Sequence, residues 1–382
     1  KSLKIEIQKH SNFFQDPLTM IAKPQNIMAS RFFVAVLLAV ILVKAKDEEL
    51  ADYCFDKATF AKLFGEYVFE ELDKDYTADD VEDFRKTIKT SSSTSFYEYN
   101  FKQLFNSKAL VNVISNSPAN DSLNVVKILK GSNDLKISPY FFGCLLNGSV
   151  IYTMQENIHS VLNSSEMMEV FKLFKPHERV FKFLQIAMAI QNLHTLGFSH
   201  QNIKPENIVS MDAQMTDVRL FDFNNAVEHG APGRGGTSRY NSPDKFDNGF
   251  LANFNHDAYA FAITMITLLD FDSKFPSSIF PRTKADFNEG FKKKFLATLL
   301  QAKKKSDLKV LYEFFELKLF DLKNPLNISE LIKKLVEVYE KVAPKKAKKN
   351  TKLDEQVKAF KNKSQQKKRG CSDDQAASEN TC

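Results

Sequence analysis

The stretch GFSHQNIKPENIV, at residues 197–209, places a dense set of polar side chains directly after a long apolar segment. That segment, residues 178–196, repeats apolar residues at helical spacing and is too apolar for a surface helix. Further along the polar stretch, Asn207 and Asp222 offer an amide and a carboxylate oxygen, the ligand types that Mg²⁺ prefers. The residues alone therefore predict a buried helix followed by a polar, metal-capable loop at 200–225.

Four segments carry a resemblance to eukaryotic protein kinases. The quoted stretch resembles their catalytic loop, H-R-D-x-K-P-x-N, and DFN at 222–224 stands in the place of D-F-G. GTSRYNSPD at 236–244 resembles G-T-x-x-Y-x-A-P-E, and Asp257 matches the buried aspartate that opens the next apolar helix. Four signals in the right order are far more specific than one. The resemblance implies a two-lobed α+β fold, with a small β-rich N-lobe and a large helical C-lobe, and ATP with Mg²⁺ as cofactors.

The resemblance implies a chemical role for four residues. Asn207 and Asp222 would bind the Mg²⁺ that bridges the phosphates, and Lys204 would neutralise the γ-phosphate. Asn202 occupies the position of the catalytic aspartate. A neutral amide cannot accept the proton of a substrate hydroxyl, and loss of a general base typically lowers a rate by about 10²–10⁴-fold.

Three further positions have structural roles in the family. His200 would pack against Phe223, and Asp257 would hold the backbone of the catalytic loop. Two neighbours depart from the family pattern: Gln201 replaces the arginine that pairs with an activation-loop phosphate, and Asn224 replaces the glycine that gives the metal-binding turn its freedom. These departures favour a degenerate site.

The glycine-rich loop of the family is predicted in LFGEYVFEEL, residues 63–72, where only Gly65 is kept. Tyr67 and Glu70 take the positions of the other two glycines, where they would obstruct and repel phosphates. Lys86 lies at a suitable spacing for the lysine of the third strand. Phe84 would then fill part of the adenine pocket.

Other N-lobe assignments leave alternatives open. Lys89 and Lys127 are rivals of Lys86 for the strand lysine. Glu98, in a predicted helical run at 96–105, is the candidate for the ion-pair partner on helix C. Glu156 closes a segment that resembles the fifth strand and hinge, where nucleotide binds. Ordinary solvated lysines and a surface glutamate remain the alternative for Lys86, Lys89 and Glu98.

Hydrophobic patterning predicts the remaining elements. Short apolar runs at 123–129 and 150–154 favour strands. Apolar residues at helical spacing predict helices at 256–269, 314–322 and 328–338, with Pro325 between the last two.

Composition and the distribution of charge predict how the chain is divided into segments. The chain has 382 residues, of which 43% are hydrophobic and 26% charged, the balance of a globular protein. We predict an unstructured upstream segment at 1–27, a signal peptide at 28–45, an N-lobe at 55–157, a C-lobe at 158–342 and a disordered basic tail at 343–382. The excess positive charge lies in this tail rather than on the domain, so we expect no nucleic-acid partner. Weak contact of the tail with polyanions is the alternative to a passive, solvated tail.

The signal-peptide prediction rests on the residues that follow Met28. Arg31 precedes twelve uncharged residues, 32–43, and a small residue follows at Ala45. Twelve residues of helix span about 18 Å, short of a hydrocarbon core of about 30 Å, so we expect no stable membrane span. We therefore predict a secreted or secretory-lumen protein. A cytoplasmic location follows if the apolar segment is a core element or Met28 is not the start.

Two other features agree with export. Five Asn-x-Ser sequons occur, at Asn120, Asn147, Asn163, Asn327 and Asn362. The four cysteines, Cys54, Cys144, Cys371 and Cys382, lack metal-ligand spacing. They allow two disulfides in three pairings, or four free thiols.

Three functions remain open from the sequence. The first is a secreted pseudokinase that acts by binding an unknown protein partner. The second is an active, atypical ATP-dependent Ser/Thr kinase, in which Asn202 orients the hydroxyl. The third is an interaction module whose nucleotide site is filled by Phe84 and Tyr67.

Overall fold

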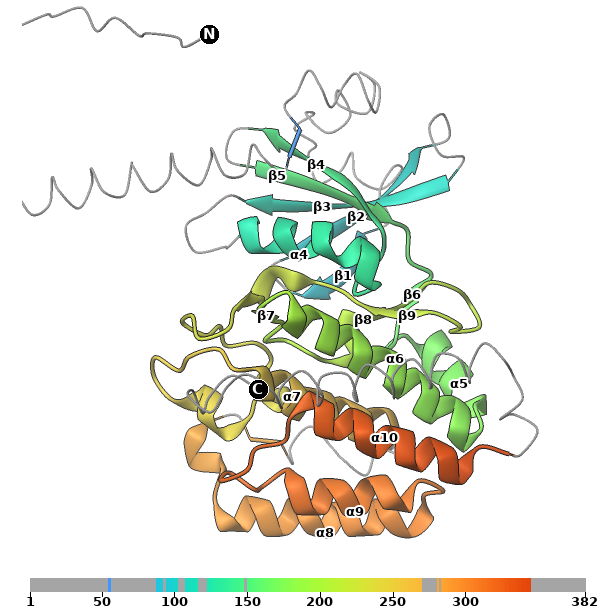
Figure 1. Cartoon of the computed structure of the whole chain (residues 1–382), viewed down its shortest axis with the longest axis vertical. Helices are drawn as coiled ribbons and strands as arrows, with labels where there is room; N and C mark the ends of the chain where they lie inside the picture. The colour runs from blue at the N-terminus through green and yellow to red at the C-terminus, as the bar shows by residue number, and fades with distance from the viewer. Residues whose placement is uncertain are drawn as a thin grey trace, which may run out of the picture. The chain divides into compact units, whose positions relative to one another are not determined.

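The computed structural model describes residues 54–55, 87–91, 94–101, 107–115, 122–147, 150–269, 280–281 and 283–344. The predicted signal peptide, the upstream segment and nearly all of the basic tail lie outside these residues. Within them, a β-rich lobe is followed along the chain by a helical lobe (Figure 1). This arrangement confirms the predicted α+β, two-lobed fold.

The smaller lobe is built on a five-stranded antiparallel sheet in the order β1-β2-β3-β5-β4. Aromatic and β-branched residues, which favour strands, recur in these segments. The strands are β1 (Thr87–Ser91), β2 (Thr94–Phe101), β3 (Ser107–Ser115), β4 (Phe141–Asn147) and β5 (Val150–Glu156). The strand predicted at 150–154 is confirmed as part of β5.

Two local predictions in this lobe are wrong. The predicted helix at 96–105 is instead β2, whose sequence TSFYEYNF is rich in aromatic side chains that suit a pleated surface. The predicted strand at 123–129 lies within helix α4 (Ser122–Leu135). Its apolar residues are spaced three and four apart, so that Val125, Val126 and Leu129 are all buried on one side.

A disulfide fastens an upstream segment to the edge of the sheet. Cys54 and Cys144 are joined, with their Cα atoms 4.7 Å apart, and both side chains are buried. Next to the bond, the backbone N–H of Phe55 donates to Cys144 O at 2.8 Å. Because β4 is an edge strand, this pairing covers part of an edge that would otherwise present free backbone groups.

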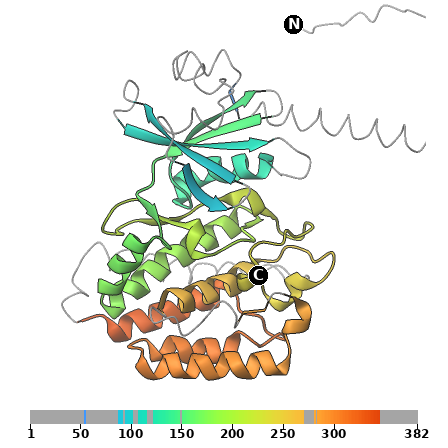
Figure 2. The same ribbon diagram turned by 180° about the vertical axis from the view of Figure 1, so that it is seen from behind.

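Helices make up the larger lobe. They are α5 (Ser165–Leu173), α6 (Pro176–Thr195), α7 (Phe254–Leu269), α8 (Glu289–Lys305), α9 (Lys309–Lys318) and α10 (Ile328–Val342). Helix α6 packs against α10 and α7, and α8 lies beside α9 (Figure 2). The predicted helices at 178–196, 256–269 and 328–338 are confirmed. The one predicted at 314–322 ends early, at Lys318, because the chain turns at Asp321, whose carboxylate accepts from two backbone N–H groups.

Short strands, four of them between α6 and α7 and one before α5, fix the polar loops. Strands β6 (Ser160–Val161), β8 (Ile208–Ser210) and β9 (Val218–Leu220) form one small sheet, and β7 (Phe198–Ser199) pairs with β10 (Val227–Glu228). The loop at 200–207 and the turn at 221–226 are therefore held at both ends. In the part of the chain that the structure describes, no helix has the length and apolar character needed to cross a bilayer.

Candidate active site

Asp257, in the first turn of α7, holds the loop that follows α6. Its carboxylate is fully buried and accepts from the backbone N–H groups of His200 and Gln201, each at 2.8 Å. Ser199 Oγ and His194 Nε2 also bond to it, both at 2.9 Å. Burial alone would raise the pKa of Asp257, but these hydrogen bonds, led by that of His194, lower it to about 2. The carboxylate is therefore ionised and fixes the start of the 200–207 loop.

The turn at Gln201 depends on two further contacts. Gln201 has a left-handed backbone, with φ of 64°, and its carbonyl oxygen accepts from Lys245 Nζ at 2.7 Å. Burial lowers the pKa of Lys245 to about 8. Gly236 lies so close that a Cβ atom there would collide with Gln201 O, and its own φ is +73°. Only glycine suits this position.

Asn202 and Lys204 both bond to Thr237, which follows Gly236. Asn202 Oδ1 accepts from the backbone N–H of Thr237 at 3.1 Å and from its hydroxyl at 3.0 Å. Lys204 Nζ donates to the same hydroxyl oxygen at 3.1 Å. All three groups are at least partly buried, and Asn202 and Lys204 are 5% and 9% exposed. The Thr237 contacts thus tie the 200–207 loop to the segment before α7.

The proposed metal ligands lie on the neighbouring segments. Asn207 is fully buried; its Nδ2 donates to Asn202 O at 2.9 Å, and its Oδ1 has no hydrogen-bond partner. Asp222 is also buried and has a left-handed backbone, with φ of 58°. One oxygen of Asp222 accepts from Asn224 Nδ2 at 3.0 Å. No cluster of three or more His, Cys, Asp or Glu side chains that could hold a metal occurs among the described residues.

His200 and Phe223 lie against each other, with ring centroids 5.1 Å apart. His200 Nε2 donates to Phe221 O at 3.1 Å. Burial lowers the pKa of this imidazole, so it is neutral at pH 7. Six of the predicted site residues therefore meet in one region: His200, Asn202, Lys204, Asn207, Phe223 and Asp257, with Asp222 beside Phe223.

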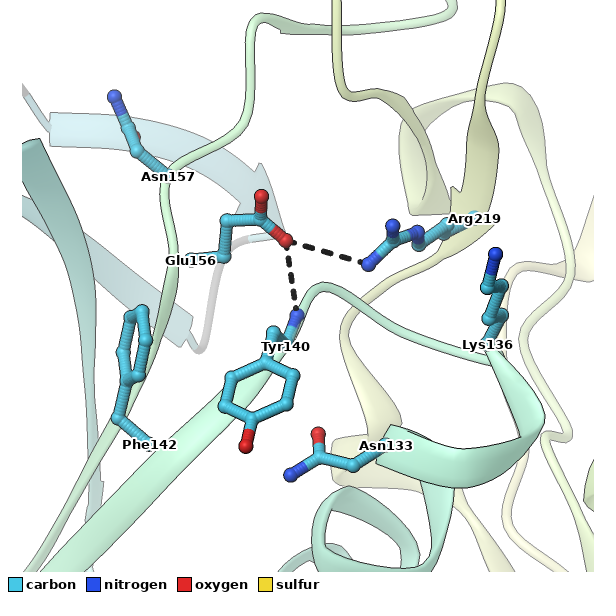
Figure 3. A pocket seen from close by; sticks show the side chains of 7 residues that line it. All are labelled: Asn133, Lys136, Tyr140, Phe142, Glu156, Asn157 and Arg219. Carbon is cyan, nitrogen blue, oxygen red and sulfur yellow. Dashed lines mark hydrogen bonds and ion pairs between the residues drawn. The ribbon is translucent and has the colours of Figure 1, made fainter.

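Glu156 has a different environment. Its Oε2 accepts from Arg219 Nη1 at 3.3 Å and from the backbone N–H of Tyr140 at 3.4 Å (Figure 3). The side chain lines a cavity of about 620 Å³ that Lys136 and Phe142 also border. None of the residues that meet around Thr237 lines that cavity. The carboxylate of Glu156 is thus engaged at a separate place.

With this geometry established, comparison with known proteins decides the family. Residues 86–367 match the protein kinase domain family. The chain belongs to the protein kinase family. It is also 33% identical over 91 residues to the zebrafish (Danio rerio) serine/threonine-protein kinase SBK1. That similarity covers 22% of this chain and 24% of the zebrafish protein, so it spans about a quarter of the relative's length.

The N-lobe of this kinase domain corrects several predictions. The matched domain begins at residue 86, after the loop predicted around Gly65, which lies outside the described residues. Lys86, also outside them, directly precedes β1, and Lys89 lies on β1, so neither is on the third strand. Glu98 lies on β2, not on a helix. The third strand of the sheet is β3, whose sequence SKALVNVIS contains one lysine, Lys108.

The helix that follows the third strand is α4, in a segment where the sequence pattern predicted a strand. Its sequence, SLNVVKILKGSNDL, contains no glutamate and a single acidic residue, Asp134, in its last turn. Lys127, a rival for the strand lysine, lies on this helix. The spacing of the buried residues Val125, Val126 and Leu129 was the signal that could have revealed the helix. The kinase domain therefore has no glutamate on α4 for the ion pair that the family makes there.

Proposed function

We propose that this kinase domain is a secreted pseudokinase that acts by binding a partner protein and transfers phosphate weakly or not at all. The observation that carries the proposal is the hydrogen bonding of Asn202. Its Oδ1 accepts both the backbone N–H and the hydroxyl of Thr237. A backbone N–H can only donate, so it fixes which amide atom is the oxygen.

This orientation leaves only a donor at the catalytic position. The second atom of the Asn202 amide is Nδ2, which has hydrogens to donate and no lone pair to accept a proton. An aspartate bonded to Thr237 in the same way would keep its second oxygen as an acceptor. The substrate hydroxyl therefore meets a donor where phosphoryl transfer uses a base.

Two other features support weak catalysis. Helix α4 has no glutamate to pair with a strand lysine, an ion pair that must be in place in active protein kinases. The carboxylate of Asp222 already accepts from Asn224, the residue that stands where the family has glycine. The asparagine therefore competes with a metal ion for one oxygen of Asp222.

ATP and Mg²⁺ are the cofactors that a kinase domain suggests in general. Asn207 Oδ1 suits a cation, because it is a buried oxygen without a hydrogen-bond partner. Asn207 and Asp222 would hold the ion, which neutralises phosphate charge when bound. Lys204, held by Thr237, would face the same phosphates. We propose that nucleotide binding is weak, because one carboxylate oxygen of Asp222, a proposed metal ligand, already accepts a hydrogen bond from Asn224.

Secretion is supported by the disulfide between Cys54 and Cys144. Disulfides persist in oxidising compartments and are rare in the cytosol. The sequon at Asn163 is also suitable for glycosylation, because this residue lies in an exposed turn between β6 and α5.

An active, atypical Ser/Thr kinase is the second candidate. It is favoured by the contact between Lys204 and Thr237, which orders the phosphate-binding lysine, and by the similarity to a protein named as a serine/threonine kinase. Phosphoryl transfer depends mostly on positioning and charge neutralisation, so an amide that orients the hydroxyl would allow slow turnover.

Nucleotide binding and transfer are tested on one preparation. Thermal denaturation with millimolar ATP and Mg²⁺ measures binding, since a ligand at 100 times its Kd stabilises by about 2.7 kcal/mol. Radiolabelled transfer to a generic substrate is then compared among wild type, Asn202→Asp and Asp222→Ala. We expect wild type to transfer phosphate no faster than Asp222→Ala. A higher transfer rate in Asn202→Asp would identify the missing base as the limiting defect. Turnover in wild type that Asp222→Ala abolishes would favour the active kinase.

Export is tested by expression from Met28 in a secreting animal-cell host. We expect the chain in the medium, with a mass that falls on treatment with a glycosidase and a modified peptide that contains Asn163. Unmodified protein that stays in the cytosol would contradict the secretory location and leave the catalytic proposal standing.

A further inference from the structure

Two side chains that are more than nine-tenths buried meet at Thr237. Lys204 is 9% exposed and Asn202 is 5% exposed. Lys204 Nζ donates to the hydroxyl oxygen of Thr237, and this hydroxyl in turn donates to Asn202 Oδ1. The three groups form one hydrogen-bonded network, and the donors that it leaves over determine which ligand can bind there.

Lys204 brings a positive charge that this network does not neutralise. Within the described part of the chain, its ammonium group forms no ion pair, and Thr237 is its hydrogen-bond partner. A buried ammonium group is costly unless an anion compensates it. An aspartate at position 202 would supply a negative charge one hydroxyl group away. The amide of Asn202 does not.

Asn202 adds a directed donor beside this charge. Because Oδ1 is taken by Thr237, the Nδ2 group is the part of the side chain that is left, and no acceptor for it occurs among the described residues. An amide N–H next to an ammonium group is an arrangement that favours an anion with several acceptor oxygens.

The neighbouring charges do not cancel this preference. Lys245 contributes a second buried ammonium group, which donates to Gln201 O. It lies next to Gly236, the residue before Thr237, since a Cβ atom there would be 3.3 Å from Lys245 Nζ. Asp257 and Asp244 favour the charged form of Lys245. Glu206 and Asp222 are two further acidic residues on or beside the 200–225 loop. In the described structure neither forms an ion pair with Lys204, and Asp222 accepts from Asn224.

We propose that Asn202 and Lys204 bind the phosphate of a phosphoserine or phosphothreonine side chain, so that the domain recognises phosphorylated protein instead of producing it. This inference rests on the proposed pseudokinase function and names its ligand. A phosphate monoester carries a charge of about −1.5 to −2 at pH 7 and three acceptor oxygens. It supplies the anion that Lys204 lacks and accepts from Asn202 Nδ2, whereas an unmodified hydroxyl can accept from Nδ2 but brings no negative charge.

The same phosphate chemistry could come from a nucleotide, so the experiment separates the two sources. Fluorescence anisotropy measures binding of the full chain to a peptide library degenerate around a central phosphoserine or phosphothreonine. The identical unphosphorylated library and ATP without Mg²⁺ form the other two arms. Binding is repeated with Asn202→Asp, which has nearly the same shape but restores the negative charge, and with Lys204→Met.

Asn163→Asp, in protein made without glycans, is the matched control, because it makes the same chemical change at an exposed turn away from Thr237. We expect the phosphorylated library to bind at least 10-fold more tightly than the unphosphorylated one. Asn202→Asp and Lys204→Met should each lose at least 10-fold, while Asn163→Asp binds like wild type. Thermal denaturation confirms that each variant is folded.

Equal binding of the two libraries would overturn the inference, and so would an Asn202→Asp variant that binds phosphopeptide as tightly as wild type. Binding of ATP that depends on Asn202, without binding of either library, would assign the site to a nucleotide phosphate and also overturn it. Transfer assays keep this failure distinct from failure of the proposed function, since the latter requires turnover by wild type.

Discussion

Asp257 shows how one buried side chain can order a whole loop. It lies in α7, yet its two oxygens accept from the backbone of His200 and Gln201, more than fifty residues earlier in the chain. The sequence predicted a structural aspartate at this position through the resemblance to the family. It could not predict the orientation of the Asn202 amide, because that depends on Thr237, 35 residues later. The role of a residue could thus be predicted from the sequence, whereas its hydrogen-bond partner could not.

Asp257→Asn is expected to destabilise the fold by about 3 kcal/mol, because an amide donor would face backbone N–H donors in a buried site. The pKa of Asp257 is about 2 in the folded state and 3.8 in the reference state. Its contribution is therefore complete above about pH 4 and lost as the pH falls towards 2. Urea unfolding between pH 2.5 and 7 measures both effects.

The variant should lose this part of the acid dependence. Asp134→Asn, at an exposed position, serves as the control and should stay within about 0.5 kcal/mol of wild type. Equal stability of Asp257→Asn and wild type at pH 7 would contradict the role given to Asp257.

Elements were predictable where their hydrophobic pattern was long. Helices α6, α7 and α10 follow from sustained apolar periodicity. Helix α4 was predicted as a strand and strand β2 as a helix. A short apolar run fits either structure, and tertiary packing determines which one forms. Glu98 was assigned to helix C because of this exchange, whereas the assignment of Gly65 lies outside the described residues and stays a prediction. The C-lobe residues were assigned from motifs with fixed spacing, and the structure brings them together.

The asparagines of two sequons have different structural roles, because Asn327 caps a helix and Asn163 lies in an exposed turn. Asn327 caps helix α10, since its Oδ1 accepts from the backbone N–H of Glu330 at 2.9 Å. We expect Asn327→Ala to lower the free energy of unfolding by about 1 kcal/mol, the usual cost of losing such a cap. Asn163→Ala, at the exposed turn, should change it by less than about 0.5 kcal/mol. Chemical denaturation of both variants, made without glycans, checks this, and equal effects would count against the cap.

At the scale of the whole molecule, charge and covalent linkage are unevenly distributed. The segment 344–370 carries a net charge of +9, while residues 46–343 carry −4. The disulfide joins residues that are 90 positions apart and encloses β1 to β3 and α4. The sequence allowed three pairings of four cysteines, and proximity in the fold was needed to choose the one between Cys54 and Cys144.

Breaking this disulfide should weaken the N-lobe. Cys54→Ser is expected to lower the free energy of unfolding by about 3 kcal/mol, because the bond restricts a long loop in the unfolded chain. Denaturant unfolding of oxidised wild type and the variant measures the loss. Adding a reductant should lower the stability of wild type to that of Cys54→Ser and leave the variant unchanged. A variant that reductant destabilises as much as wild type would contradict this pairing.

A single-turnover measurement shows whether the amide donor of Asn202, at the position where catalysis needs an acceptor, prevents phosphate transfer. The chain, in excess over radiolabelled ATP with Mg²⁺ and a mixed peptide substrate, is quenched over time and the transferred phosphate is counted. We expect a rate no higher than that of Asp222→Ala. Transfer by wild type at about 1 s⁻¹ or faster, within the ordinary range of kinases, would contradict it.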